Sequence, residues 1–163
     1  MFFRTSLAAA AAALILVACG GGDDPVTPLE PRTTSVRVVG DSLNDSGTFG
    51  IKFTVQGTPD APSLIWTDRV AAAVSVPTLC PRYAATGPST VAFNPAATAC
   101  TSYGVGSGRI NPRGEPDTTR FSVVQQLKDV RAQSPYNPEE LLLVDGGGND
   151  IADLVGDYLA APG

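Results

Sequence analysis

Residues 38–47 read VVGDSLNDSG, and the fold predicted for this chain starts from this stretch. The β-branched run SVRVV at residues 35–39 is typical of a short strand, and the run stops at Gly40. Glycine and aspartate are the residues that a turn after a strand requires. A serine presented at that edge, Ser42, is therefore a candidate for more than turn formation.

Composition limits the class of protein. The chain has 163 residues, which favours one domain, and 43% of them are hydrophobic and 17% charged, as expected of a folded body with a core. The net charge is −5 with no basic run, which argues against nucleic acid as a partner. There is no histidine, so the usual proton acceptor near neutral pH is missing.

The first segment has the pattern of an export signal. Residues 1–18 combine a short positive start with an apolar run that is too short to span a bilayer. The LVAC at residues 16–19 resembles a bacterial lipobox, in which cleavage precedes Cys19 and this cysteine is lipidated. Gly20 follows where an aspartate would mark inner-membrane retention, which favours the outer membrane. Ordinary cleavage near Ala18, or an apolar helix, is the alternative.

The sequence predicts a tether and then a folded body. Residues 19–34 are rich in Gly, Pro, Asp and Thr, as in a flexible linker that holds residues 35–163 away from a lipid surface. An exported protein meets oxidising conditions, so Cys80 and Cys100 are the expected disulfide pair, with two unreacted buried thiols as the alternative. We therefore expect a lipid-anchored protein of the bacterial cell envelope.

Periodicity in the body predicts a layered α/β domain. Residues 63–76 suggest an amphipathic helix that ends before Pro77, and residues 117–133 suggest a second one, capped by Asp117 or Thr118. The apolar run at residues 141–144 is typical of a strand buried on both faces, and residues 151–160 are again helical in pattern. The first helix is expected to place Leu64, Ile65, Val70, Ala73 and Val74 on one stripe, and the residues that recur at helical spacing in the second are Phe121, Val124, Leu127, Val130 and Arg131. In a parallel sheet the polar clusters at 40–45 and 146–150 would share one rim.

Three blocks carry a resemblance to a known family. GDSLNDSG at 40–47 resembles the first block of the GDSL, or SGNH, hydrolases, and GGND at 147–150 resembles their third. Between them, TSYGVGSGRINP at 101–112 is similar to the second block. The resemblance runs from about Ser35 to Leu154. It implies a three-layer flavodoxin-like parallel sheet, incomplete at the C-terminus.

The resemblance also implies a set of catalytic roles. Ser42 would be the nucleophile, although alone it could merely cap the following turn. The oxyanion donors would be the backbone N–H of Ser42, a backbone N–H of the Gly106-Ser107-Gly108 loop and the side-chain amide of Asn149. An ungapped match places Ser107 where the family has glycine, and a shift of one residue would restore glycine, so the loop donor stays open. The expected substrate is a lipid, short-chain or carbohydrate ester.

Other chemistries lack their signatures. The chain has no Gly-x-Ser-x-Gly elbow and no glycine spacing of a phosphate-binding loop. No cofactor is implied. A metal site would lack histidine, and the two body cysteines are far apart. We expect Asp41, Asp45 and Asp150 to order loops rather than to bind metal.

The family's fourth block, Asp-x-x-His, is absent. One explanation is a truncated gene product. It is favoured because a sheet that ends after so few strands would leave an unpaired edge. The other is a natural variant that has lost catalysis. We therefore expect near-background esterase activity from this chain, with a non-catalytic surface lipoprotein or binding module, or an incomplete product without function of its own, as alternatives.

Overall fold

The computed structural model describes residues 32–58, 63–112 and 119–161, which belong to one compact unit. The predicted signal segment at 1–18, the lipidated Cys19 and all but the last three residues of the tether at 19–34 lie outside these residues. The cap expected from Asp117 or Thr118 also lies outside them. Within the described ranges, no helix is long and apolar enough to cross a membrane.

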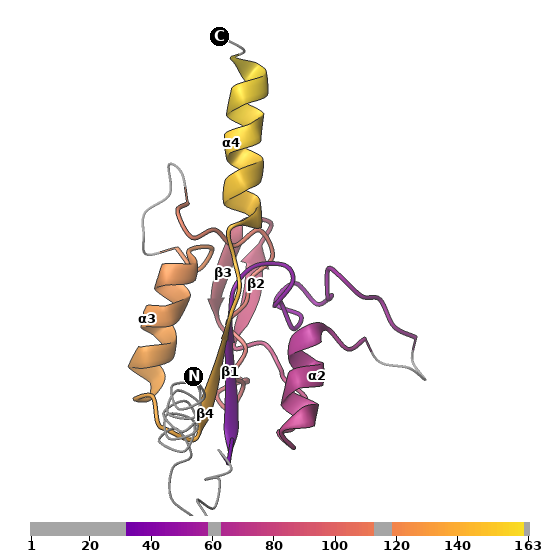
Figure 1. Ribbon diagram of the computed structural model, residues 1–163, viewed down its shortest axis with the longest axis vertical. Coiled ribbons are helices and arrows are strands. Elements are labelled where there is room, and N and C mark those ends of the chain that lie inside the picture. The colour runs from indigo at the N-terminus through magenta and orange to yellow at the C-terminus, as the bar shows by residue number, and fades with distance from the viewer. Residues whose placement is uncertain (1–31, 59–62, 113–118, 162–163) are drawn as a thin grey trace, which may run out of the picture. The chain divides into compact units, whose positions relative to one another are not determined.

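A parallel pair of strands organises the fold (Figure 1). Strand β1, Ser35–Val39, pairs with β4, Glu140–Val144, so that Val39 lies beside Val144 at the end of both strands. Both strands were predicted, and both are confirmed. Arg37 in β1 is nearly buried and forms an ion pair with Glu140, 2.7 Å between Nε and Oε2.

The side chains of β1 alternate between two cores. Val36 and Val38 pack with Ala71 of helix α2, Trp66–Ala73. Val39 packs on the other side with residues of α3, Val123–Gln133. Figure 1 shows α2 and α3 on opposite sides of the strand pair. This alternation follows from the period of two in a strand, and it buries both faces of β1.

The two predicted helices are confirmed, but their buried faces differ from the prediction. Val124 is 40% exposed, and Arg131 is also exposed. The buried face of α3 instead includes Gln126 and Asp129 beside Val123 and Val130, and that of α2 includes Thr67 and Asp68 beside Ala71. Gln126 and Asp129, and one carboxylate oxygen of Asp68, find hydrogen-bond partners in these buried positions, which a pattern of hydrophobic residues does not reveal.

Between α2 and α3 the chain forms a hairpin that was not predicted. Strands β2, Tyr83–Gly87, and β3, Thr90–Phe93, pair in antiparallel fashion. The predicted disulfide between Cys80 and Cys100 encloses this hairpin and is confirmed, with the two Cα atoms 5.1 Å apart.

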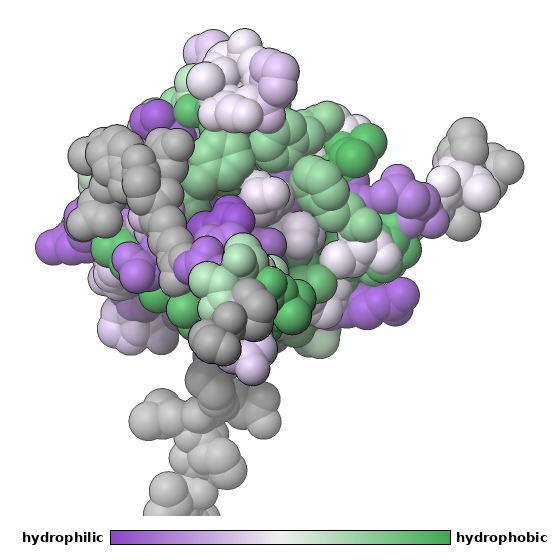
Figure 2. All heavy atoms as spheres, turned by 90° about the horizontal axis from the view of Figure 1, so that it is seen from above, coloured by the Kyte–Doolittle hydropathy of each residue, from purple (hydrophilic) through white to green (hydrophobic). Residues whose placement is uncertain are grey.

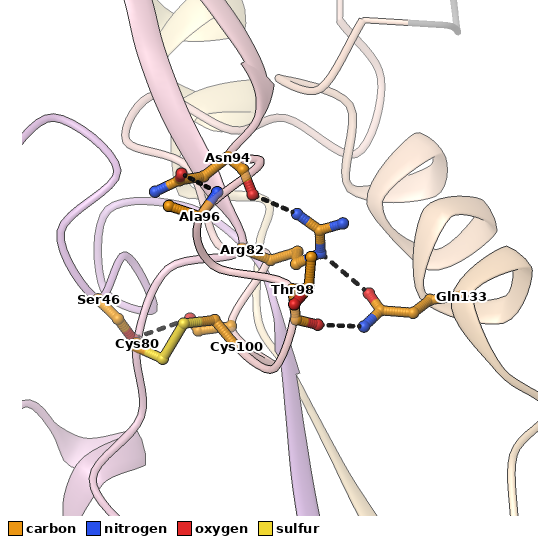
Figure 3. The surroundings of a disulfide bond; sticks show 9 residues. Ser46, Cys80, Arg82, Asn94, Ala96, Thr98, Cys100 and Gln133 are labelled. Atoms are coloured by element: carbon orange, nitrogen blue, oxygen red, sulfur yellow. Dashed lines mark hydrogen bonds between the residues drawn. A yellow bond between two sulfur atoms is a disulfide. The ribbon is translucent and has the colours of Figure 1, made fainter.

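The end of α3 holds the disulfide region in place, as Figure 3 shows. Gln133 accepts a hydrogen bond from Nε of Arg82 at 3.2 Å. Its Nε2 donates to the carbonyl of Thr98 at 3.0 Å. Because Arg82 and Thr98 both lie between the two cysteines, the crosslinked segment is fastened to the helix as well as closed on itself.

The predicted three-layer flavodoxin-like sheet is wrong. The described residues hold a two-stranded parallel sheet and a two-stranded antiparallel sheet. On the side of β1 away from β4, the chain meets β1 at only one bridged residue, Ser102, which also bridges to Pro81. The N–H of Gly40, the next donor of the chain after Val38 on this side, donates to Oε1 of Gln126 at 2.7 Å, so the ladder with this segment does not continue as a strand.

Helix α4, Gly148–Ala160, was predicted, and it carries an exposed apolar stripe. None of its residues is buried, and the exposed fractions of the stripe lie between 51 and 72% for Ile151, Leu154, Val155, Tyr158 and Leu159. Figure 2, seen from above relative to Figure 1, shows hydrophobic and hydrophilic residues side by side on this side of the molecule. Strand β4 was expected to be buried on both faces, but it is only half-buried and Val144 is 53% exposed.

Candidate active site

Two polar segments leave the parallel strands at the same edge. Gly40 follows β1 and Asp145 follows β4, and the register Val39 to Val144 places them side by side. A Cβ added to Gly40 would lie only 2.8 Å from the carbonyl oxygen of Asp145. Gly40 also has φ of +149°, so both the space and the backbone favour glycine here. The shared rim expected from the sequence is therefore present.

Ser42 lies in a turn that its neighbour closes. The Oδ1 of Asp41 accepts from the N–H of Leu43 at 2.9 Å, and the carbonyl of Asp41 accepts from the N–H of Asn44 at 3.1 Å. The turn is therefore capped by Asp41 rather than by Ser42. The side chain of Ser42 is half-buried. Within the described residues, neither its hydroxyl nor its backbone N–H makes a hydrogen bond.

Two fully buried amide side chains fasten this turn, and the sequence did not identify either. Gln126 of α3 accepts from the N–H of Gly40 at 2.7 Å and donates to the carbonyl of Gly40 at 3.1 Å. Asn44 donates to the carbonyl of Val39 at 2.7 Å and accepts from the indole N–H of Trp66, also at 2.7 Å. A polar residue inside an apolar helical stripe was the one available signal for Gln126. Nothing in the pattern marked Asn44.

The second segment, residues 104–108, packs tightly against the first. A Cβ on Gly104 would lie 2.6 Å from the carbonyl oxygen of Asn44. A Cβ on Gly108 would lie 2.8 Å from the carbonyl oxygen of Gly40 and 3.2 Å from the Cα of Asp41. Both contacts are with backbone, which cannot move away as a flexible side chain could. Only glycine fits at these two positions, and the two segments are in direct contact as a result.

The hydrogen bonds of the Gly106-Ser107-Gly108 loop leave one free donor. The N–H of Gly106 donates to Oδ2 of Asp45 at 2.8 Å, and the N–H of Gly108 donates to the carbonyl of Val105 at 2.9 Å. The N–H of Ser107 has no acceptor among the described residues. Ser107 has φ of +68°, a left-handed conformation that glycine adopts most easily. Of the alignments that the sequence allowed, the one that uses Ser107 therefore offers an N–H without an acceptor among the described residues.

Asp45 joins the two segments. Besides Gly106, its carboxylate accepts from the N–H groups of Gly47 at 2.9 Å and Thr48 at 2.7 Å. Burial raises the pKa of Asp45, and the backbone hydrogen bonds from Thr48, Gly47 and Gly106 oppose this rise. The carboxylate is thus a loop-ordering group, as the sequence suggested.

The third segment reaches the other two through Asn149. Its Nδ2 donates to the carbonyl of Gly108 at 2.8 Å, which leaves the second N–H of this amide available. A Cβ on the preceding Gly148 would lie 3.9 Å from Oδ2 of Asp41. The first turn of α4 is also tied to the second segment, because Asp150 accepts from the N–H groups of Ile110 at 3.0 Å and Asn111 at 2.7 Å.

A cleft lies next to Ser107. Its volume is about 940 Å³, and Gly106 and Ser107 form part of its lining, whereas Ser42 and Asn149 do not. It extends between the loop that follows Ser42 in the sequence and helix α4. The three predicted site residues are thus brought to neighbouring segments, but only Ser107 borders the cleft.

The composition of the site limits its chemistry. The chain contains no histidine, and among the described residues no group of three histidines, cysteines or carboxylates could hold a metal ion. The arrangement offers a hydroxyl, free N–H donors and well-ordered carboxylates. Comparisons of the chain with family models, curated proteins and solved structures found no match.

Proposed function

We propose that this chain is an ester hydrolase of the GDSL type, with Ser42 as the nucleophile and an oxyanion hole formed by Ser42, Ser107 and Asn149. The observation that most supports this is the meeting of three segments far apart in sequence. Gly108 touches the backbone next to Ser42, and its carbonyl accepts from Asn149. Each of the three proposed donor residues has an N–H that makes no hydrogen bond within the described residues.

The chemistry would be acyl transfer. The Ser42 oxygen bonds to the ester carbonyl carbon while the hydroxyl proton leaves, and negative charge develops on the former carbonyl oxygen. Donors already in place stabilise that charge better than water does. The alcohol then departs, and water releases the acid from the acyl-serine. Because the chain has no histidine, the proton passes to solvent and the reaction is slow.

The missing base suggests a sharp test. Imidazole added at pH 8, where most of it is neutral, can accept the proton in place of a histidine side chain. The rate of hydrolysis of p-nitrophenyl acetate is measured with and without imidazole, and the reaction of free imidazole with the ester is subtracted. We expect imidazole to stimulate the wild-type chain and to have no effect on Ser42→Ala.

Ser107→Ala is the matched control. It removes an exposed hydroxyl but keeps the backbone N–H, so the stimulation by imidazole should remain. If Ser107→Ala abolishes it and Ser42→Ala does not, the nucleophile is misassigned. An organophosphonate that modifies a residue other than Ser42, as located by mass spectrometry, would lead to the same conclusion.

A non-catalytic binding module is the second candidate, and the complete absence of histidine favours it. In this case the same pocket would hold an ester or a related ligand without cleaving it. The two candidates differ in one measurement. A binding module would show no Ser42-dependent hydrolysis at any concentration of imidazole.

We also propose that the protein is anchored in the bacterial cell envelope, on the outer membrane, through lipid on Cys19. The support is the apolar run before this cysteine and the disulfide, which requires an oxidising compartment. Cells that express the full chain are labelled with radioactive palmitate and fractionated. Label and outer-membrane association should both be lost in Cys19→Ala, and retention of either would contradict the anchor.

A further inference from the structure

Aromatic side chains line one wall of the cleft beside Ser107. Phe49, Phe53 and Phe121 all contribute to it. The ring centroids of Phe49 and Phe53 are 5.8 Å apart in an edge-to-face arrangement, and those of Phe49 and Phe121 are 6.4 Å apart. Phe53 is 44% exposed although it is a large apolar residue. Rings that remain partly exposed beside a cleft can receive another ring at about the same spacing.

The opposite wall leaves room for a ligand. It is formed by α4, which contributes the small residues Ala152 and Gly156 together with Asp153 and Asp157. A Cβ added to Gly156 would meet no atom within 4 Å. The volume of about 940 Å³ lies within the range of small-molecule sites, roughly 300–1,000 Å³.

The cleft begins at the proposed oxyanion donor. The ring of Phe53 packs on Gly106, since a Cβ there would lie 2.3 Å from its Cε2. Gly106 and Ser107 both border the cleft. A carbonyl oxygen held by the N–H of Ser107 would therefore place the rest of its molecule against the phenylalanine wall.

We infer that the cleft binds the aryl group of an ester that carries one. This inference rests on the function proposed above, and it specifies the substrate class of the same site. An aryl group is favoured over a straight alkyl chain because ring pairs gain attraction beyond the burial of apolar surface. Arg109, which also lines the cleft, is paired with Asp153 at 2.6 Å. The ligand therefore need not carry a charge to neutralise it.

The test measures binding rather than catalysis. Benzylacetone has an aryl group and a carbonyl that cannot be hydrolysed, and methyl hexyl ketone is a straight-chain counterpart. Each is titrated into the full chain, and the amide shift of Ser107 is followed by NMR. We expect benzylacetone to bind about tenfold more tightly than methyl hexyl ketone.

A substitution on α4 tests the location. Gly156→Leu projects a side chain into the open space of the cleft and should weaken the binding of benzylacetone by about tenfold. Replacing glycine within a helix favours folding, so loss of structure is not expected. Val155→Leu changes the neighbouring residue, which does not line the cleft, and it should bind as the wild type does.

The outcomes separate this inference from the proposed function. Equal affinities for the two ketones, or unchanged binding in Gly156→Leu, would overturn the aryl cleft and leave the Ser42 test unaffected. Tight binding at Ser107 in a chain without Ser42-dependent hydrolysis would support the cleft and refute the hydrolase.

Discussion

Replacing Gln126 with leucine tests how the serine turn is held. Gln126 is fully buried, and its side-chain amide forms hydrogen bonds with both the N–H and the carbonyl of Gly40. It also donates to the carbonyl of Arg120 at 3.0 Å. Leucine has a similar volume and helix propensity, so the substitution removes hydrogen bonds with little change in packing.

The expected loss in the free energy of unfolding follows from the polar groups of Gly40 that lose a hydrogen-bond partner. The N–H of Gly40 would lose its acceptor while still buried, which costs about 1–3 kcal/mol. The carbonyl of Gly40 would keep the N–H of Val105 at 3.1 Å, so its loss is smaller. We expect the free energy of unfolding to fall by about 2–3 kcal/mol, a large share of the roughly 5–15 kcal/mol typical of a domain.

Urea unfolding followed by circular dichroism measures this change. Lys128→Leu is the matched control, since Lys128 is exposed on the same helix and the new residue is the same. This control should stay within about 0.5 kcal/mol of the wild type. A Gln126→Leu chain as stable as the control would show that the amide does not hold Gly40, and the account of the serine turn would fail.

Two further predictions concern stability. Burial raises the pKa of Asp45 above its usual 3.8, so the folded chain keeps this proton to higher pH than the unfolded chain does. The resulting stability is fully present below pH 3.8 and is lost as the pH rises through the folded-state pKa. The free energy of unfolding of the wild type minus that of Asp45→Asn, measured by urea titration at several pH values, should therefore fall as the pH rises, and a difference that rises would contradict the assigned direction. Removing the disulfide with Cys80→Ser and Cys100→Ser should reduce the free energy of unfolding by about 3 kcal/mol, as expected for a loop of this length. A loss below about 0.5 kcal/mol in the same assay would mean that the crosslink adds little to the hydrogen bonds around it.

The sequence predicted the elements of the fold better than their assembly. Both strands of the parallel pair and all three helices were found, because a β-branched run, a continuous apolar run and helical spacing are local signals. The hairpin between residues 83 and 93 was missed, since its strands are short and contain alanine and glycine. The predicted sheet had too many strands, because a local sequence pattern does not show how many strands pair with one another.

The sequence indicated the residues that follow the strand ends in the candidate site, but not the buried residues that hold them in place. Ser42 and Asn149 follow the ends of paired strands, a position that chain order and strand direction determine. The proposal of Ser107 as the loop donor needed the hydrogen bonds of its neighbours, because sequence alone allowed two alignments of the loop. The role of Gln126 could not be assigned from its position on the helix alone, because its partner, Gly40, lies 86 residues away.

The residues that hold the turn of Ser42 are separate from the residues that line the cleft, so the two sets can change independently in evolution. The supports of the serine turn, Gln126 and Asn44, do not line the cleft, whose walls come from the Phe49–Phe53 loop, Phe121 and α4. Residues that line the cleft can therefore vary while those that hold the turn of Ser42 stay constant. Selection or engineering for new ligands should accumulate changes on the cleft walls and spare the two buried amides.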